Sequence, residues 1–343
     1  MEYHKPPFVL KEFKIEVTDQ CNLACVHCSS NAGVHRSKFL EIGIVIRILK
    51  EAYELGARKI SFSGGEPFLW LDLIEAINVG FKLGYDVSVY TTGNVPDFNR
   101  SICEIHNAGL ARLIFSVYSS SDSIHESITR IRGSFANTIK SITYSVAANI
   151  ETELHFVALK SNYKELENVV KMASRLGVSR TSVLRFVPQG RGALMGDELL
   201  NKIENLDLRK TVVDLRDRGY NIRTGSPFNF LMLNKQPKCS SAIDRCVIDS
   251  SLNVFPCDAF KNISSSDVVG TSANSNLYNA SFPNVWDNSP YLNAIRQYLT
   301  TPFAIQCEQC SNLELCLSGC LAQKFLVHGQ LKKISDPMCI KSR

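Results

Sequence analysis

The sequence predicts an α/β protein in which a partial (β/α)6 barrel of the TIM type precedes a smaller, loop-rich domain with many cysteines. Three observations lead to this prediction. Strand-like and helix-like segments alternate six times within the first 190 residues, polar or cysteine-containing loops follow the strands, and the last third is rich in Asn, Ser, Pro and Cys. Alternating strands and helices imply parallel strands joined by right-handed crossovers, and six such units close only part of an eight-unit barrel.

Each predicted strand is a short apolar run, and each predicted helix has apolar residues at helical spacing. The strands are 14–17, 59–62, 86–90, 111–117, 152–157 and 180–187. The helices are 42–55, 69–83, 99–108, 135–148, 163–176 and 206–218. Glycine follows five of these helices, as it commonly does where a left-handed residue ends a helix. In barrels of this kind the functional loops follow the carboxyl ends of the strands.

The same pattern divides the chain into four parts. We expect a lead-in at 1–10, the partial barrel at 11–190, a linker with one helix at 191–238 and the cysteine-rich domain at 239–343. The last part is expected to have little apolar core of its own, so bound metal would have to supply folding energy.

The composition argues against several classes of protein. The 343 residues are 45% hydrophobic and carry a net charge of +5, which is too weak to indicate binding of nucleic acid. There is neither a run of eighteen apolar residues nor a signal peptide, so we expect a cytoplasmic protein without a membrane segment. Of 12 cysteines, all but Cys103 fall within 21–28 or 239–339, as metal ligands would. Cys103 is expected to be a buried structural thiol.

Three thiols lie within eight residues directly after the first predicted strand, at Cys21, Cys25 and Cys28. A fully ligated [4Fe–4S] cluster needs four cysteines, so three leave one iron open to a small molecule with an amine and a carboxylate. The alternative is zinc, which favours C-x2-C pairs with a fourth ligand nearby. His27 lies between two of the cysteines, a poor position for that ligand, so the spacing favours the cluster.

The C-x3-C-x2-C loop resembles that of the radical S-adenosylmethionine (SAM) superfamily, and Gly64-Gly65-Glu66-Pro67, after the second strand, resembles the GGEP motif of that family. Taken alone, the second motif could also be a plain turn before a helix. The resemblance implies an oxidoreductase whose open iron binds the methionine end of SAM, and whose cluster yields a 5′-deoxyadenosyl radical that abstracts hydrogen. It further implies that Glu66 holds the SAM amino group, and that a flavodoxin- or ferredoxin-type protein donates the electron.

The resemblance assigns further positions to SAM binding. Ser116, at the end of the fourth strand, is expected to contact the ribose or the carboxylate, and Arg130 to pair with the carboxylate, with Arg132 as its rival. Thr92 stands where many relatives carry Asn, and His27 stands where a residue near the adenine is often aromatic. The alternatives are a solvated surface position for either arginine and a neutral, packed loop position for His27.

Eight further cysteines resemble the SPASM domain of radical SAM enzymes that modify peptides and proteins; the run C-x2-C-x5-C-x3-C is distinctive. The resemblance implies two auxiliary [4Fe–4S] clusters, and therefore three clusters in all. The inner cluster would be held by Cys239, Cys246, Cys257 and Cys320, and the outer one by Cys307, Cys310, Cys316 and Cys339. Two zinc sites are the alternative that the count alone permits. Leu252 stands where relatives often have Gly, so the turn there is expected to differ.

Fully ligated auxiliary clusters relay electrons but cannot easily bind substrate, which favours oxidation of a substrate radical. We therefore expect a maturase of a ribosomally made peptide that installs an oxidative thioether or carbon–carbon crosslink. Small-molecule oxidation and sulfatase-type formation of formylglycine are the alternatives. Peptide epimerisation is disfavoured because it needs a thiol that returns a hydrogen atom, and Cys103, the cysteine without an assigned role, is badly placed for this. An electron carrier would not need the Gly-Gly-Glu-Pro loop. With ten residues before the barrel, a separate leader-binding protein or direct recognition of the peptide is expected.

Overall fold

The computed structural model describes residues 8–233 and 237–341. Their strands form one sheet of nine in the order β7-β6-β5-β4-β3-β2-β1-β8-β9. All neighbours pair in parallel except β8 and β9. The strands are β1 (Glu12–Thr18), β2 (Lys59–Gly64), β3 (Asp86–Thr91), β4 (Arg112–Ser116), β5 (Glu151–Ala158), β6 (Arg180–Arg185), β7 (Ile222–Thr224), β8 (Arg245–Ile248) and β9 (Val254–Phe255).

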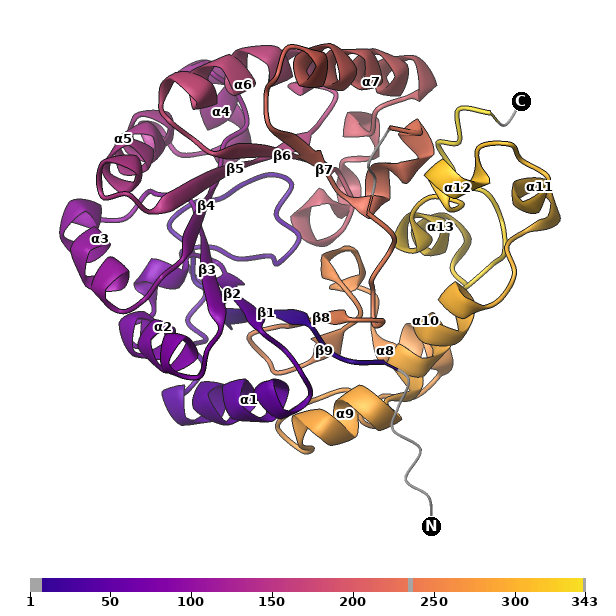
Figure 1. Cartoon of the computed structure of the whole chain (residues 1–343), viewed down its shortest axis with the longest axis horizontal. Helices are drawn as coiled ribbons and strands as arrows, with labels where there is room; N and C mark the ends of the chain where they lie inside the picture. The colour runs from indigo at the N-terminus through magenta and orange to yellow at the C-terminus, as the bar shows by residue number, and fades with distance from the viewer. Residues whose placement is uncertain (1–7, 234–236, 342–343) are drawn as a thin grey trace.

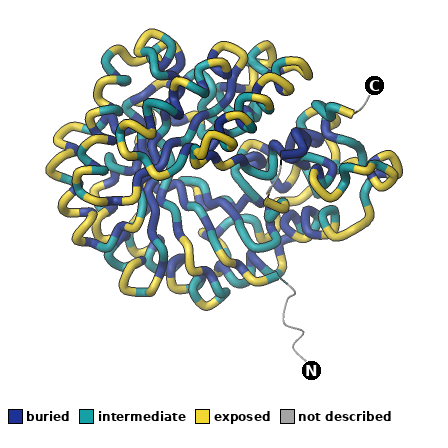
Figure 2. The backbone as a smooth tube through the Cα atoms, turned by 45° about the horizontal axis from the view of Figure 1, so that its top comes forward, coloured by how far each residue is buried: buried dark blue, intermediate teal, exposed yellow. Residues whose placement is uncertain are grey.

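The sheet curves into an open ring with helices on its outside (Figure 1). The helices of the barrel are α1 (Ile42–Glu54), α2 (Leu73–Lys82), α3 (Phe98–Asn107), α4 (Asp122–Thr129), α5 (Ser134–Ala147), α6 (Leu166–Arg175) and α7 (Lys202–Asp217). Figure 2 shows buried residues along the strands and exposed residues on the outer faces of the helices. The predicted partial barrel and its six strand–helix units are therefore confirmed.

The structure differs from the predicted elements in three places. The predicted helix 69–83 is a 3₁₀ helix η1 (Pro67–Leu69), followed after a break by α2, because the chain turns at Glu66 and Pro67 rather than at Leu69. Helix α4 was not predicted, since its eight residues include only two apolar ones. Strands β7, β8 and β9 have two to four residues each, too few for a pattern of alternation to stand out.

In the residues that the structure describes, the C-terminal part contains six α-helices, and its buried apolar residues join the core of the barrel instead of forming a core of their own. The helices are α8 (Ser265–Val269), α9 (Phe282–Asn288), α10 (Pro290–Thr300), α11 (Ile305–Glu308), α12 (Leu313–Cys316) and α13 (Leu321–His328). Phe282, Trp286, Tyr291 and Phe325 are buried and belong to the same core as the barrel. Each short helix contributes only a few apolar residues, so no helical period was visible.

Strand β8 pairs with the free edge of β1, so the C-terminal part continues the sheet of the barrel. The division of the chain near residues 190 and 238 stays a prediction. Within the described residues, no helix combines the length and the apolar character that crossing a bilayer requires.

Candidate active site

The first three cysteines lie in a loop that the barrel holds by its backbone. The loop follows β1, and its residues Ala24 and Val26 donate N–H bonds of 3.1 and 2.9 Å to the carbonyls of Thr129 and Ile128 at the end of α4. Cys21 and Cys25 are buried, while Cys28 is half-buried. Burial raises the pKa of the Cys21 thiol to about 12, and burial together with the other two thiols raises the pKa of Cys25. The three thiols are therefore close enough to influence one another, and their ligation of a shared cluster stays a prediction.

Arg191 clamps this loop, a contact that the sequence analysis did not find. Its Nε donates to the carbonyl of Cys25 at 2.9 Å, its Nη1 to that of Ala32 at 2.5 Å, and its backbone N–H to that of Cys28 at 3.0 Å. The sequence feature that could have indicated this contact is an arginine between two glycines in the loop that follows β6. Gly190 is required here, because a Cβ would lie 2.4 Å from the Cys28 carbonyl oxygen.

The two glycines after β2 also approach the cysteine loop. A Cβ on Gly65 would lie 1.9 Å from the carbonyl oxygen of Gln20, and one on Gly64 would lie 2.3 Å from that of Thr18. The backbone N–H groups of Gly65 and Glu66 donate to the same two carbonyls at 2.8 Å. The close approach that the glycines permit is therefore to the chain that leads into Cys21.

Glu66 is fully buried and accepts four hydrogen bonds. Thr91 Oγ1 and the backbone N–H of Phe68 donate to Oε1 at 2.9 and 3.2 Å. Thr92 donates to Oε2 from both its backbone N–H and its hydroxyl, each at 2.7 Å. Burial raises the pKa of Glu66, and these donors oppose the rise. The structure therefore places Thr92 against Glu66, where its hydroxyl orients the carboxylate.

His27 and Tyr118 line the same region. Their rings meet edge to face with centroids 4.7 Å apart, and the Tyr118 hydroxyl contacts Ser116 at the end of β4. Burial lowers the pKa of His27 to about 4, so the imidazole is neutral. The buried atoms His27 Nδ1 and Asn22 Oδ1 lack a hydrogen-bond partner. Such atoms next to buried thiols fit a polar ligand such as SAM beside a cluster.

The two candidate arginines are both exposed. Arg130 ends α4 with a left-handed φ of 62°, uncommon for a residue other than glycine. It directly follows Thr129, whose carbonyl binds the cysteine loop. This position lies nearer the loop along the chain than Arg132 does, and the pairing of Arg130 with the SAM carboxylate stays a prediction.

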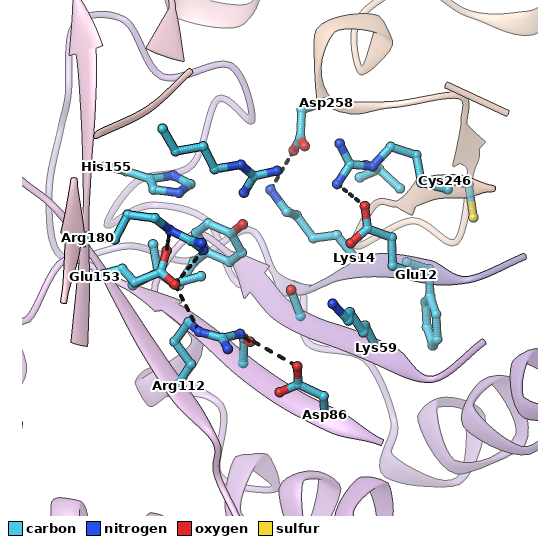
Figure 3. A pocket seen from close by; sticks show the side chains of 18 residues that line it. Glu12, Lys14, Lys59, Asp86, Arg112, Glu153, His155, Arg180, Cys246 and Asp258 are labelled. Atoms are coloured by element: carbon cyan, nitrogen blue, oxygen red, sulfur yellow. Dashed lines mark hydrogen bonds and ion pairs between the residues drawn. The ribbon is translucent and has the colours of Figure 1, made fainter. Parts of the chain in front are cut away.

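At the opposite end of the strands, the barrel encloses a charged chamber of about 320 Å³ (Figure 3). Its six basic residues are Lys14, Lys59, Arg112, Arg180, Arg223 and Arg245, and its four acidic residues are Glu12, Asp86, Glu153 and Asp258. Each of the four acidic residues forms an ion pair, and the basic partners are Lys14, Arg112, Arg180 and Arg245. Lys59 and Arg223 are the two basic residues outside these pairs, so the chamber has an excess of positive charge.

Lys14 and Asp258 form an ion pair inside this chamber, with Nζ and Oδ1 2.8 Å apart. The Lys14 ammonium also lies 4.1 Å from the centroid of the Tyr90 ring. Burial alone would lower the pKa of Lys14, but Asp258 and Tyr90 outweigh it and raise that pKa. Burial alone would raise the pKa of Asp258, but Lys14 and Lys261 outweigh it and lower that pKa. Both groups are therefore charged at neutral pH, and Asp258 is a weak base.

Three of the four predicted inner ligands lie together. Burial raises the pKa of Cys257 to about 12, and Cys239 and Cys320 contribute to the rise. Asp336 organises this region, since its buried carboxylate accepts two hydrogen bonds from Arg185 at 2.8 and 2.9 Å and one from the N–H of Cys320 at 2.9 Å. Cys246 is buried on β8, and the charged groups that act on its thiol are Arg296 and Arg245 and none of these three cysteines.

Among the predicted outer ligands, burial contributes most to the raised pKa of Cys316, and Cys339 and Cys307 add to the rise. Lys324 lies beside them and is only 2% exposed. Its Nζ donates to Ser318 Oγ at 2.7 Å, and that oxygen lies 3.4 Å from Cys307 Sγ. In residues 8–233 and 237–341, no three His, Cys, Asp or Glu side chains are grouped as ligands of one metal ion. Metal ligation by these cysteines stays a prediction.

Two expectations about single residues need revision. Leu252 adopts a left-handed φ of 66°, the conformation that glycine favours, while its side chain is buried. A leucine therefore occupies a turn suited to glycine, with its burial offsetting the strain. The prediction that Cys103 is buried is wrong, because α3 buries Phe98, Ile102 and Ile105 and turns Cys103 to the solvent.

Comparison with known proteins agrees with this site. Residues 15–173 match the radical SAM superfamily. The chain is 25% identical to an AdoMet-dependent heme synthase of Oleidesulfovibrio alaskensis over 94% of this chain and 85% of the relative. It is 26% identical to a PqqA peptide cyclase of Granulibacter bethesdensis over 95% of this chain and 86% of the relative. Streptococcus suis SuiB bound to the precursor peptide SuiA superposes with a TM-score of 0.77 at 18% identity, covering 96% of this chain and 76% of SuiB.

Proposed function

Residues 15–173 match the radical SAM superfamily, an enzyme family that uses SAM and a [4Fe–4S] cluster, and we propose that this chain modifies a ribosomally made peptide by an oxidative crosslink. The crosslink would be a thioether or a carbon–carbon bond. Relatives named as a peptide cyclase and a fold shared with a protein that binds a precursor peptide support a peptide substrate.

The observation that carries this proposal is the position of the charged chamber. Tyr90 and Ile114 line it, and each lies two residues before a predicted SAM contact, Thr92 and Ser116. Residues two apart on a strand share a face, so the chamber ends directly beneath the SAM region. A peptide side chain that enters from the amino ends of the strands would meet SAM at the other end.

The chain's own residues then have distinct roles. Cys21, Cys25 and Cys28 would hold the catalytic cluster, Glu66 would receive the SAM amino group, and Arg191 fixes the loop between them. When bound, the cluster and SAM supply a radical that removes a hydrogen atom from the substrate. Gly64 and Gly65 let β2 pack against the cysteine loop, and the buried surroundings of Cys25 and Tyr118 exclude water.

The C-terminal cysteines would accept an electron from the substrate. We assign Cys307, Cys310, Cys316 and Cys339 to an outer cluster, and Cys239, Cys257 and Cys320 to an inner one. Three of these seven cysteines are buried and four are half-buried, and α13, which directly follows Cys320, contacts the barrel through a hydrogen bond from Gln323 to the carbonyl of Phe186. These positions support the assignment. A flavodoxin- or ferredoxin-type donor and a separate leader-binding protein are further parts of this proposal, and a cytoplasmic location stays a prediction.

A second candidate is the oxidation of a small molecule that carries carboxylates. The similarity to a heme synthase supports it, as does the excess of positive charge in the chamber at Lys59 and Arg223. The same charge in a peptide maturase would favour a substrate segment with Asp or Glu beside the reacting residue.

Anaerobic co-expression with each short open reading frame beside the gene would test the function. A peptide that loses about 2 Da per modified site, the mass of two hydrogens, supports the oxidative maturase, and fragmentation then locates the bond. The matched control is Cys25→Ala, which should yield only unmodified peptide. Unchanged masses for every peptide, together with oxidation of a small carboxylic acid by the purified enzyme, would favour the second candidate.

A further inference from the structure

Cys246 faces away from the other inner cysteines. In the parallel pairing of β1 and β8, Cys246 is the partner of Phe13, and Lys14 is the partner of Val247. Neighbours in register share a face of the sheet. Lys14 points into the barrel, where it binds Asp258, while Phe13 packs edge to face on Phe282 of the outer helix α9 with centroids 5.7 Å apart. Phe13 and Cys246 both border the chamber, but the face that they share turns the Cys246 side chain toward the outer helices and away from Lys14.

The surroundings of its sulfur agree with this orientation. Cys246 is 2% exposed and belongs to the same apolar core as Cys320, so its burial alone does not separate it from the other inner cysteines. The charged groups near it are Arg296 and Arg245, whereas those near Cys257 include Cys239 and Cys320. Figure 3 also shows the Cys246 sulfur on the side of its strand away from Lys14 and Asp258.

The strand cannot easily turn to bring this sulfur to the others. Moving β8 by one residue would exchange its two faces. Arg245 would then leave the barrel interior and lose its ion pair with Glu12. Val247 would also move from one face to the other, and Cys246 would leave an apolar site that it fills.

We propose that only three cysteines, Cys239, Cys257 and Cys320, hold the inner auxiliary cluster, and that its fourth iron is open to a ligand from outside the chain. Iron in such clusters prefers thiolate, so the ligand class is a soft donor such as a thiol. Asp258 lines the chamber and directly follows Cys257, so this inner cysteine lies next to the chamber in which we place the substrate. This last step rests on the proposed function and favours a substrate peptide with a cysteine.

The test compares valine and serine at two positions of the full chain, reconstituted anaerobically. Valine is apolar, close to cysteine in size and unable to bind iron. Serine is a poor but possible iron ligand, and in an apolar core its hydroxyl is left without a hydrogen-bond partner. Cys246→Val should keep all of the roughly twelve irons of three clusters. Cys246→Ser should also keep its iron, but should unfold at lower denaturant. At the control position, Cys257→Val should lose about four irons, and Cys257→Ser should lose fewer.

Loss of about four irons in Cys246→Val, with partial recovery in Cys246→Ser, would show that Cys246 is a ligand and would overturn the proposal. Should Cys246→Val fail to fold, iron retention in the folded fraction of Cys246→Ala, whose side chain cannot bind iron, decides the same question. The open iron has its own readout, in a chain whose three N-terminal cysteines are replaced by alanine. Adding 2-mercaptoethanol should move the g-values of the reduced inner cluster, and unmoved g-values contradict an open iron. These readouts do not depend on peptide modification, so either proposal can fail alone.

Discussion

Thr92 donates two hydrogen bonds to a single carboxylate oxygen of Glu66, from its backbone N–H and from its hydroxyl, each at 2.7 Å. With the bonds from Thr91 and Phe68, the carboxylate already accepts four, which is about as many as it has lone-pair sites. An ammonium group can therefore reach Glu66 only by replacing a donor. The Thr92 hydroxyl is the donor that can rotate away, since the backbone N–H groups are fixed.

Thr92→Val removes this hydroxyl and keeps the shape of the side chain. The SAM-free protein should lose about 1.5–3 kcal/mol of stability, the range for a hydrogen bond to a charged group. SAM should then raise the melting temperature of the variant more than that of the parent, because its ammonium fills the vacant acceptor site. Thermal unfolding with and without SAM measures both effects.

Thr91→Val is the matched control. Each of the two hydroxyls also accepts a backbone N–H bond, from Gly93 at 3.0 Å for Thr91 and from Asn94 at 3.1 Å for Thr92. Thr91 is buried whereas Thr92 is half-buried, so we expect an ammonium to replace the Thr92 hydroxyl and not that of Thr91. This variant should be destabilised without a larger gain from SAM. A smaller gain from SAM in Thr92→Val than in the parent would mean that SAM binding needs the hydroxyl.

Gly65→Ala should disturb the cysteine loop. The new Cβ would lie 1.9 Å from the Gln20 carbonyl oxygen, so the backbone just before Cys21 must move. Reconstituted protein should lose about four irons and its cleavage of SAM, while the auxiliary clusters remain. Iron analysis and assay of 5′-deoxyadenosine would check this result.

Gly43→Ala provides the control, since nothing lies within 4 Å of that position in α1. It should keep its iron and gain roughly 0.5–1 kcal/mol, because alanine favours helix over glycine. Equal iron in the two variants would show that the loop tolerates the displacement.

Lys324→Met should lower the reduction potential of the outer cluster. The ammonium is buried beside Cys307 and Ser318, and the carboxylate that acts on it most, Asp336, is bound to Arg185 instead. Removing one positive charge a few ångströms away at an effective dielectric constant of about 20 shifts a potential by roughly 0.1 V. Redox titration followed by EPR would measure the shift.

Lys324→Arg keeps the charge and should keep most of the potential, and Lys332→Met removes a charge at an exposed position. An unchanged potential in Lys324→Met, or an equal shift in Lys332→Met, would remove Lys324 from any role in tuning the cluster.

Replacing both Lys59 and Arg223 by Gln should weaken binding of a substrate with carboxylates. These two basic residues of the chamber lie outside its ion pairs, so their charge is available to a ligand. Losing about 1.4 kcal/mol of attraction would raise the dissociation constant about tenfold. Fluorescence anisotropy with the labelled substrate peptide would measure the change.

Lys82→Gln on the exposed side of α2 is the control for net charge and should leave the affinity unchanged. If the double variant binds as tightly as this control, the substrate does not place a carboxylate in the chamber.

The sequence alone predicted the order of strands and helices and the two groups of cysteines. Both are local properties, because apolar spacing reports helices and strands one element at a time, and a short loop brings Cys21, Cys25 and Cys28 together whatever surrounds it. Leu252 marks the limit of such reasoning. The sequence indicated an altered turn, but the left-handed backbone remained and a buried side chain offset its strain.

The tertiary structure decided which residues meet across the barrel. Arg191 reaches the cysteine loop from a segment 163 residues after Cys28, and no local pattern encodes that contact. Register is likewise non-local: pairing β8 with β1 sends Arg245 inward and Cys246 outward. A cysteine count treats all eight C-terminal thiols alike, but a strand shows alternate side chains to opposite faces. The sequence by itself thus determined the chemistry that this protein carries, and the pairing of distant strands decided which thiols can share a cluster.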